Sequence, residues 1–150
     1  LVLIDAGIYH GGPPGFLKYF FFPFDVLAAR SFYTKGARAR SLQNSYYNQS
    51  MITDELVNNY LKPAGTPGAA AVVARMNKFA SIRHEDISRR LRVPTLLVWG
   101  RYDKIVPVSD AERLNREING SQLVIIDEAG HMVQEEKPNE VADAILKFLK

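Results

Sequence analysis

Residues 93–107 read Val-Pro-Thr-Leu-Leu-Val-Trp-Gly-Arg-Tyr-Asp-Lys-Ile-Val-Pro. Within this segment, Pro94 precedes the run 95–99, which is apolar except for Thr95, and Gly100 ends it. A short continuous apolar run bounded by turn residues predicts a strand that is buried on both faces, as in parallel sheets. The first carboxylate after this predicted strand is Asp103.

The residues that follow alternate between helix and strand patterns. Ser109 and Glu112 have the spacing of a capping box, which predicts a helix that runs to the stop signal Asn119-Gly120. The apolar run 123–126 predicts the next strand, and Pro138 stands where the first position of a final helix is expected.

The start of the chain predicts one more strand, because residues 1–4 are all apolar and Asp5-Ala-Gly7 ends the run. Residues 13–80 contain helix-like stretches, including 54–61, and predict a helical excursion between the first strand and the second. Strands that alternate with helices imply a parallel sheet with crossover helices. We therefore expect an α/β fold divided into a core strand (1–12), a helical cap (13–80) and a C-terminal core segment (81–150).

Composition excludes several classes of protein and site. The chain has 150 residues, 47% apolar and 23% charged, with a formal net charge of +3, as in an ordinary globular domain. No apolar run approaches the roughly 20 residues that span a bilayer, and the basic residues form no nucleic-acid-binding motif. The absence of cysteine excludes disulfides, thiolate metal sites and a cysteine nucleophile. We expect no metal, cofactor, membrane or nucleic-acid partner, and a cytoplasmic location.

Three polar residues follow the three predicted strands: Asp5, Asp103 and His131. In an open parallel sheet the carboxyl ends of the strands form the ligand-binding edge. A carboxylate and an imidazole that meet there form a useful pair, because the carboxylate fixes the tautomer of the imidazole and stabilises its protonated form. Gly130, just before the histidine, permits a close backbone approach at this point.

The segment 93–107, followed by Gly130-His131 and then by Glu136-Lys-Pro138, resembles the last third of an α/β-hydrolase. In that family the acid follows the penultimate strand and the histidine follows the last one. The resemblance implies that Asp103 is the acid of a catalytic triad and His131 its base. It also implies a small, largely apolar substrate with water as co-substrate. The run 131–136 is similar to epoxide hydrolases, haloalkane dehalogenases and carbon–carbon bond hydrolases.

The nucleophile of that family is missing from this sequence. It would stand on a tight strand-to-helix elbow such as Gly-x-Ser-x-Gly or an aspartate variant, and none of the serines or aspartates lies in such a frame. The chain also opens on Leu1 without an initiator methionine or a signal-peptide pattern. We therefore expect a truncated fragment whose nucleophile lies upstream, which is inactive alone and can pair with an N-terminal hydrolase half.

Several alternatives stay open at this point. Asp103 could merely cap a turn, His131 could be a surface loop histidine, and Asp5 is either an alternative acid or the residue that closes a turn. The segment His10-Gly11-Gly12 is similar to the oxyanion loop of lipases, although no elbow follows it. For function, the alternatives are a non-catalytic remnant that binds a partner chain through its apolar first strand, and a cofactor-free oxygenase or lyase on the same fold.

Overall fold

The computed structural model describes residues 1–9, 33–72, 75, 88 and 90–150. The chain forms two compact units: Leu1–His10, Gln43–Met51 and His84–Lys150 make up the first, and Gly11–Leu42 and Ile52–Arg83 the second. Residues 43–51 thus group with the first unit, although they fall inside the predicted cap, 13–80. The predicted divisions stay a prediction, and much of the predicted cap, like the His10-Gly11-Gly12 segment, lies outside the described residues.

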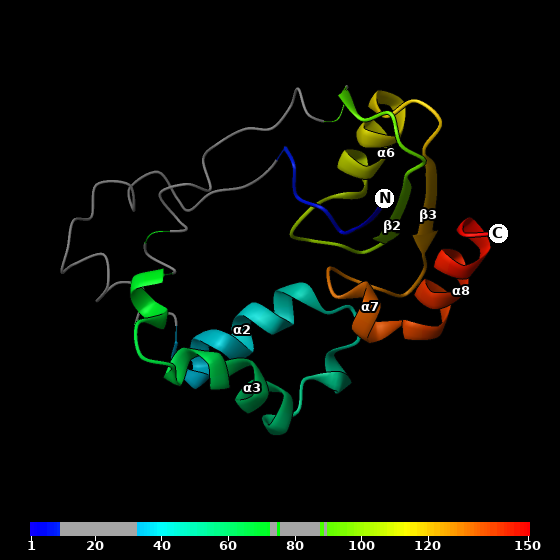
Figure 1. The fold of residues 1–150 in the computed structure, drawn as a ribbon. Helices are drawn as coiled ribbons and strands as arrows, with labels where there is room; N and C mark the ends of the chain where they lie inside the picture. Colours follow the sequence, from blue (N-terminus) through cyan, green and yellow to red (C-terminus); the bar gives the residue numbers. More distant parts are fainter. Residues whose placement is uncertain (10–32, 73–74, 76–87, 89) are drawn as a thin grey trace. The chain divides into compact units, whose positions relative to one another are not determined.

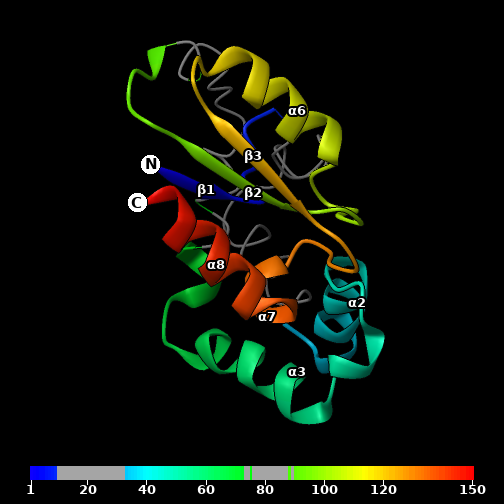
Figure 2. The same ribbon diagram turned by 90° about the vertical axis from the view of Figure 1, so that its right-hand side faces the viewer.

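The first unit contains a three-stranded parallel sheet in the order β1 (Val2–Ile4), β2 (Leu96–Gly100) and β3 (Gln122–Ile126). The strands lie in register, with Val98 of β2 opposite Ile4 and Val124 of its neighbours. Figure 2 shows all three strands together with the helices of this unit. The predicted parallel sheet and its crossover helix are confirmed.

Both faces of β2 are buried, which explains its unbroken apolar sequence. Leu96 and Val98 belong to a core cluster on the side of α8 (Pro138–Phe148), whereas Leu97 and Trp99 belong to a cluster on the side of α6 (Val108–Glu117). Successive side chains of a strand point to opposite faces, so one apolar run supplies both cores. Burial of each such side chain stabilises the fold by about 1.5 to 3 kcal/mol.

The ends of α6 and α8 test the predicted helix signals. The residue at the first position of α8 is Pro138, as predicted, because its fixed φ and missing N–H suit that position. The prediction of a capping box at Ser109 and Glu112 is wrong, because α6 begins at Val108, after an extended Pro107, and has no side-chain cap. Since the helix has already started, the Ser109 side chain stands within the first turn and not ahead of it.

A polar cluster ties the end of α6 to residues that follow β1 and precede β2. The carboxylate of Glu117 accepts hydrogen bonds from the hydroxyls of Tyr9 (2.6 Å) and Ser88 (2.5 Å) and from the guanidinium of Arg113 (2.9 Å). The same guanidinium lies 3.8 Å from the centre of the Tyr9 ring. We call these four residues the Glu117 cluster.

The described part of the second unit is helical. It holds most of α2 (Lys35–Ser45), all of α3 (Asp54–Leu61) and the 3-10 turn η3 (Lys62–Gly65), while η2 (Gln49–Met51) belongs to the first unit. The hydroxyl of Thr53 caps α3 by accepting a hydrogen bond from the amide of Leu56 at 3.1 Å. The helix predicted over 54–61 is therefore confirmed (Figure 1). Among the described residues, no helix combines the length and the apolar character needed to cross a membrane.

Candidate active site

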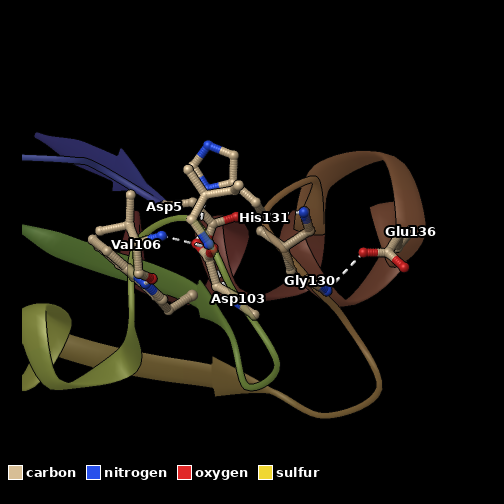
Figure 3. Close-up of polar contacts among 10 residues, drawn as sticks. Asp5, Asp103, Val106, Gly130, His131 and Glu136 are labelled. Carbon is tan, nitrogen blue, oxygen red and sulfur yellow. Dashed lines mark hydrogen bonds and ion pairs between the residues drawn. The ribbon is translucent and has the colours of Figure 1, made fainter. Parts of the chain in front are cut away.

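The three predicted site residues lie together at the carboxyl edge of the sheet. Asp5 directly follows β1, Asp103 comes three residues after the end of β2, and His131 comes five residues after the end of β3. One side-chain atom from each residue lies within 4.8 Å of the corresponding atoms of the others. Figure 3 shows the three side chains converging from three separate loops.

Asp103 and His131 form a direct pair. The Nδ1 atom of the imidazole lies 2.8 Å from Oδ2 of Asp103. The other carboxylate oxygen accepts hydrogen bonds from the backbone amides of Ile105 (2.7 Å) and Val106 (2.8 Å). An ionised carboxylate only accepts hydrogen bonds, so Nδ1 carries the proton and Nε2 is left with its lone pair. Asp103 therefore accepts hydrogen bonds within a turn through one oxygen and contacts the imidazole through the other, and its role as the acid of a catalytic triad stays a prediction.

The charge environment makes His131 a stronger base than a free imidazole. The hydrogen bond to Asp103 raises the pKa of His131, burial opposes this effect, and the negative charges of Asp103 and Asp5 add to it. The Asp103 side chain is fully buried, whereas 26% of the His131 side chain is exposed. In Figure 3 the second ring nitrogen points away from Asp103. The imidazole is thus held by one nitrogen and available at the other.

The loop that carries His131 is fixed by backbone contacts. The amide of His131 donates to the carbonyl of Ser45 at 2.7 Å. The carboxylate of Glu136 accepts from the amides of Gly130 (2.6 Å) and Asn48 (2.7 Å), so it joins the histidine loop to residues 43–51. A Cβ at Gly130 would lie only 2.4 Å from the Ser45 carbonyl oxygen. The close approach predicted at Gly130 is confirmed, and its partner is the backbone of residues 45–47.

Asp5 occupies an unusual position beside the pair. Its backbone is left-handed, with φ of 43°, and only 6% of the residue is exposed. Its Oδ1 accepts from the amide of Gly100 (3.0 Å), and its Oδ2 accepts from the amide of Val133 (3.4 Å). Burial raises the pKa of Asp5 to about 7, opposed by the Gly100 hydrogen bond and reinforced by the charge of Asp103. The carboxylate that hydrogen-bonds His131 is that of Asp103.

The same three residues carry ligand types that metal ions use. However, all four carboxylate oxygens of Asp5 and Asp103 already accept hydrogen bonds, and Nδ1 of His131 is one of the donors. This arrangement favours an acid–base pair over a metal centre.

A family model described as the alpha/beta hydrolase fold matches residues 22–138. This chain belongs to the alpha/beta hydrolase family. Across its full length the chain is 25% identical to the uncharacterized hydrolase YugF of Bacillus subtilis, of which it covers 55%. It is 33% identical over 110 residues to 2-hydroxy-6-oxo-2,4-heptadienoate hydrolase of Pseudomonas putida, which corresponds to 69% of this chain and 40% of that protein.

Solved structures with the same fold also match this chain. The meta-cleavage product hydrolase from Pseudomonas fluorescens, solved with acetates, matches with a TM-score of 0.69 and 25% identity, over 99% of this chain and 54% of that one. A thermophilic esterase from Thermogutta terrifontis shares the fold with a TM-score of 0.71 at 22% identity, over 99% of this chain and 54% of that one. This chain spans about half the length of YugF and of the solved structures that it matches.

The contacts of Ser45 and Glu136 around the histidine loop were not predicted from the sequence. Glu136 entered the sequence argument only as part of a family-like segment, and Ser45 carries no local signal at all. The contact of Ser45 uses its backbone carbonyl, which every residue has, so only the tertiary fold identifies Ser45 as a partner of the histidine loop.

Proposed function

We propose that this chain forms the histidine-and-acid part of a hydrolase that cleaves a small, largely apolar substrate with water. The observation that carries the proposal is the 2.8 Å contact between His131 Nδ1 and the buried Asp103, which leaves Nε2 available. This is the arrangement of the base and the orienting acid in a nucleophile–histidine–acid triad.

In this proposal Nε2 of His131 transfers the protons. With a serine nucleophile, Nε2 takes the hydroxyl proton as the oxygen attacks the substrate, and then delivers it to the leaving group. With an aspartate nucleophile, Nε2 takes a proton from the water that hydrolyses the covalent ester. In both versions Asp103 stabilises the imidazolium that forms, and no metal or cofactor takes part.

We further propose that the nucleophile is supplied by a segment outside these 150 residues. The sequence contains no nucleophile elbow. In the sheet of the described residues, β1 pairs with β2 alone. The other edge of β1 is therefore available for a strand of that segment.

The substrate class is proposed from the names of relatives. The Pseudomonas putida relative is named as a hydrolase of 2-hydroxy-6-oxo-2,4-heptadienoate, and mouse monoacylglycerol lipase ABHD6 is 36% identical over 66 residues, which is 44% of this chain and 19% of that protein. We infer an ester or a carbon–carbon bond next to a ketone, with epoxides and halides as the remaining candidates. A cytoplasmic location stays a prediction from the sequence.

Substitution in the longest natural chain that contains these residues tests the proposal. We expect His131→Ala to lower kcat/KM for a nitrophenyl ester or a dienoate at least about 10³-fold, and Asp103→Asn to lower it about 10² to 10⁴-fold. The exposed Asp143→Asn on α8 serves as a matched charge control and keeps wild-type turnover. Undiminished hydrolysis by a folded His131→Ala protein would refute the assignment.

The 150-residue chain by itself tests the position of the nucleophile. We expect no turnover, since a base without a nucleophile has nothing to activate. Ester hydrolysis by the purified chain that disappears in His131→Ala would show that the nucleophile lies within it. A folded chain that binds a partner along β1, while the longest natural chain hydrolyses neither ester nor dienoate, would favour the non-catalytic alternative.

A further inference from the structure

Asp5 contacts both of the loops that present the candidate active-site pair. Gly100, which donates to Oδ1, lies three residues before Asp103 in the chain, and Val133, which donates to Oδ2, lies two residues after His131. One carboxylate therefore bridges the end of β2 and the beginning of α7 (Val133–Glu136).

The two loops that Asp5 bridges also pack closely against each other. A Cβ placed on Gly100 would lie 2.0 Å from the carbonyl oxygen of Gly130 and 2.7 Å from that of Ala129. The end of β2 and the histidine loop thus touch through their backbones, beside the place where Asp5 joins them. The backbone at Asp5 is left-handed, with φ of 43°, directly after the end of β1.

The electrostatic surroundings of Asp5 are those of the active-site pair. Among the described residues, the charged groups that act on it are Asp103, which repels its negative charge, and His131, which attracts it when protonated. Both groups come from the loops that Asp5 bridges, and the ligand atoms of all three residues lie within 4.8 Å of one another. At that distance an opposite charge favours the ionised form of each partner.

We propose that Asp5 is a positioning residue: it holds the two loops that present Asp103 and His131, and its carboxylate stabilises positive charge on the imidazole. When His131 accepts a proton, Asp5 is driven to ionise, so the imidazolium is held between two carboxylates. Only the catalytic consequence of this role rests on the proposed hydrolase function. The contacts and the charge effect do not depend on it.

The experiment is an NMR titration of His131 in the full 150-residue chain, with its ring signals identified by comparison with His131→Gln. We expect Asp5→Asn, which keeps the shape of the side chain and removes its charge, to lower the pKa of His131, because the negative charge of Asp5 is one of the causes that raise it. Asp143→Asn on the exposed side of α8 changes the net charge equally and leaves the titration unchanged.

A merely structural Asp5 predicts a different result. In that case Asp5→Asn would change stability while the pKa of His131 stayed within measurement error in the folded variant, and the proposal would be overturned. Should the variant fail to fold, ¹³C NMR of the Asp5 carboxyl in the unaltered chain decides. We expect it to titrate near 7, with a matching second inflection in the His131 curve, and a His131 curve without an inflection at the pH where Asp5 titrates contradicts the proposal.

This readout needs no turnover, so it separates the two proposals. If His131→Ala left hydrolysis by the longest natural chain intact, the hydrolase mechanism would fail while the Asp5 effect could still be measured. If Asp5→Asn left the imidazole unchanged, the positioning role would fail and the pair of Asp103 and His131 would stand.

Discussion

Replacement of Asp5 by asparagine has a predictable effect on the pH dependence of stability. Burial raises the pKa of Asp5 from 3.8 to about 7, so the folded protein binds this proton more tightly than the unfolded chain does. The contribution of this tighter proton binding to the free energy of unfolding is fully present below about pH 3.8 and is lost as the pH rises through 7. At about 1.4 kcal/mol per pKa unit, the loss is on the order of 4 kcal/mol, of which roughly 2 to 3 falls between pH 5 and pH 8.

Asparagine carries no charge, so Asp5→Asn escapes this loss. The variant does lose one acceptor, because its amide nitrogen cannot accept from the Val133 amide, at a cost of about 1 to 3 kcal/mol. That cost is independent of pH and cancels when the two proteins are compared at two pH values. We therefore expect the unfolding free energy of wild type relative to Asp5→Asn to fall by roughly 2 to 3 kcal/mol between about pH 5 and about pH 8.

Urea denaturation measures this difference directly. The single tryptophan, Trp99, is buried in β2 and reports unfolding by its fluorescence. Asp143→Asn should follow the wild-type pH dependence, because the side chain that it changes is on the exposed side of α8. If wild type and Asp5→Asn gave parallel stability curves between the two pH values, Asp5 would not be a buried titrating carboxyl and the reasoning would be wrong.

Two further substitutions test other contacts. Glu117→Gln should lower the unfolding free energy by about 3 kcal/mol at neutral pH, because a charged acceptor of three hydrogen bonds is lost. Burial raises the pKa of Glu117, but the hydrogen bonds outweigh this effect and lower the pKa to about 2. The stabilisation that the ionised Glu117 gives the fold is therefore present above pH 4.5 and is lost as the pH falls toward 2. Urea melts of wild type and Glu117→Gln should converge at that low pH. Gly130→Ala should cost about 1 to 3 kcal/mol in the same assay and disturb the His131 amide signal by NMR, since its Cβ meets the Ser45 carbonyl; an unchanged His131 amide would contradict this.

The strands could be predicted because each one carries its own signal. The run from Leu96 to Trp99 is apolar on both faces, and both faces are buried in two separate cores. Both boundaries were one residue off: the strand was predicted over 95–99, whereas β2 spans Leu96–Gly100 and pairs Gly100 with Ile126. The start of α6 was mispredicted because the capping-box spacing ignores the preceding residue, and an extended Pro107 ends the loop before Ser109 is reached.

The meeting of Asp103 and His131 could also be predicted, for a geometric reason. Parallel neighbouring strands end at the same edge of a sheet, so residues a few positions beyond each strand come together whatever their separation in sequence. The anchoring of the histidine loop could not be predicted in this way. It uses the carbonyl of Ser45 and the amide of Asn48, which are backbone groups of a segment far from β3 in the sequence.

The role of Asp5 could not be decided from the sequence. The cost of burying its carboxylate indicates that the carboxylate does more than close a turn. The sequence allowed either an acid or a turn residue, and the choice depends on burial and on φ, which only the fold sets. If Asp5 served only to close a turn, asparagine would be the less costly residue there, because it tolerates left-handed backbone and carries no charge to bury. The residue is instead a carboxylic acid whose ionisation is opposed by burial and whose oxygens lie within reach of the imidazole. Asp5 adds two things over asparagine, an acceptor for the Val133 amide and a negative charge, and the group beside it that would use this charge is His131.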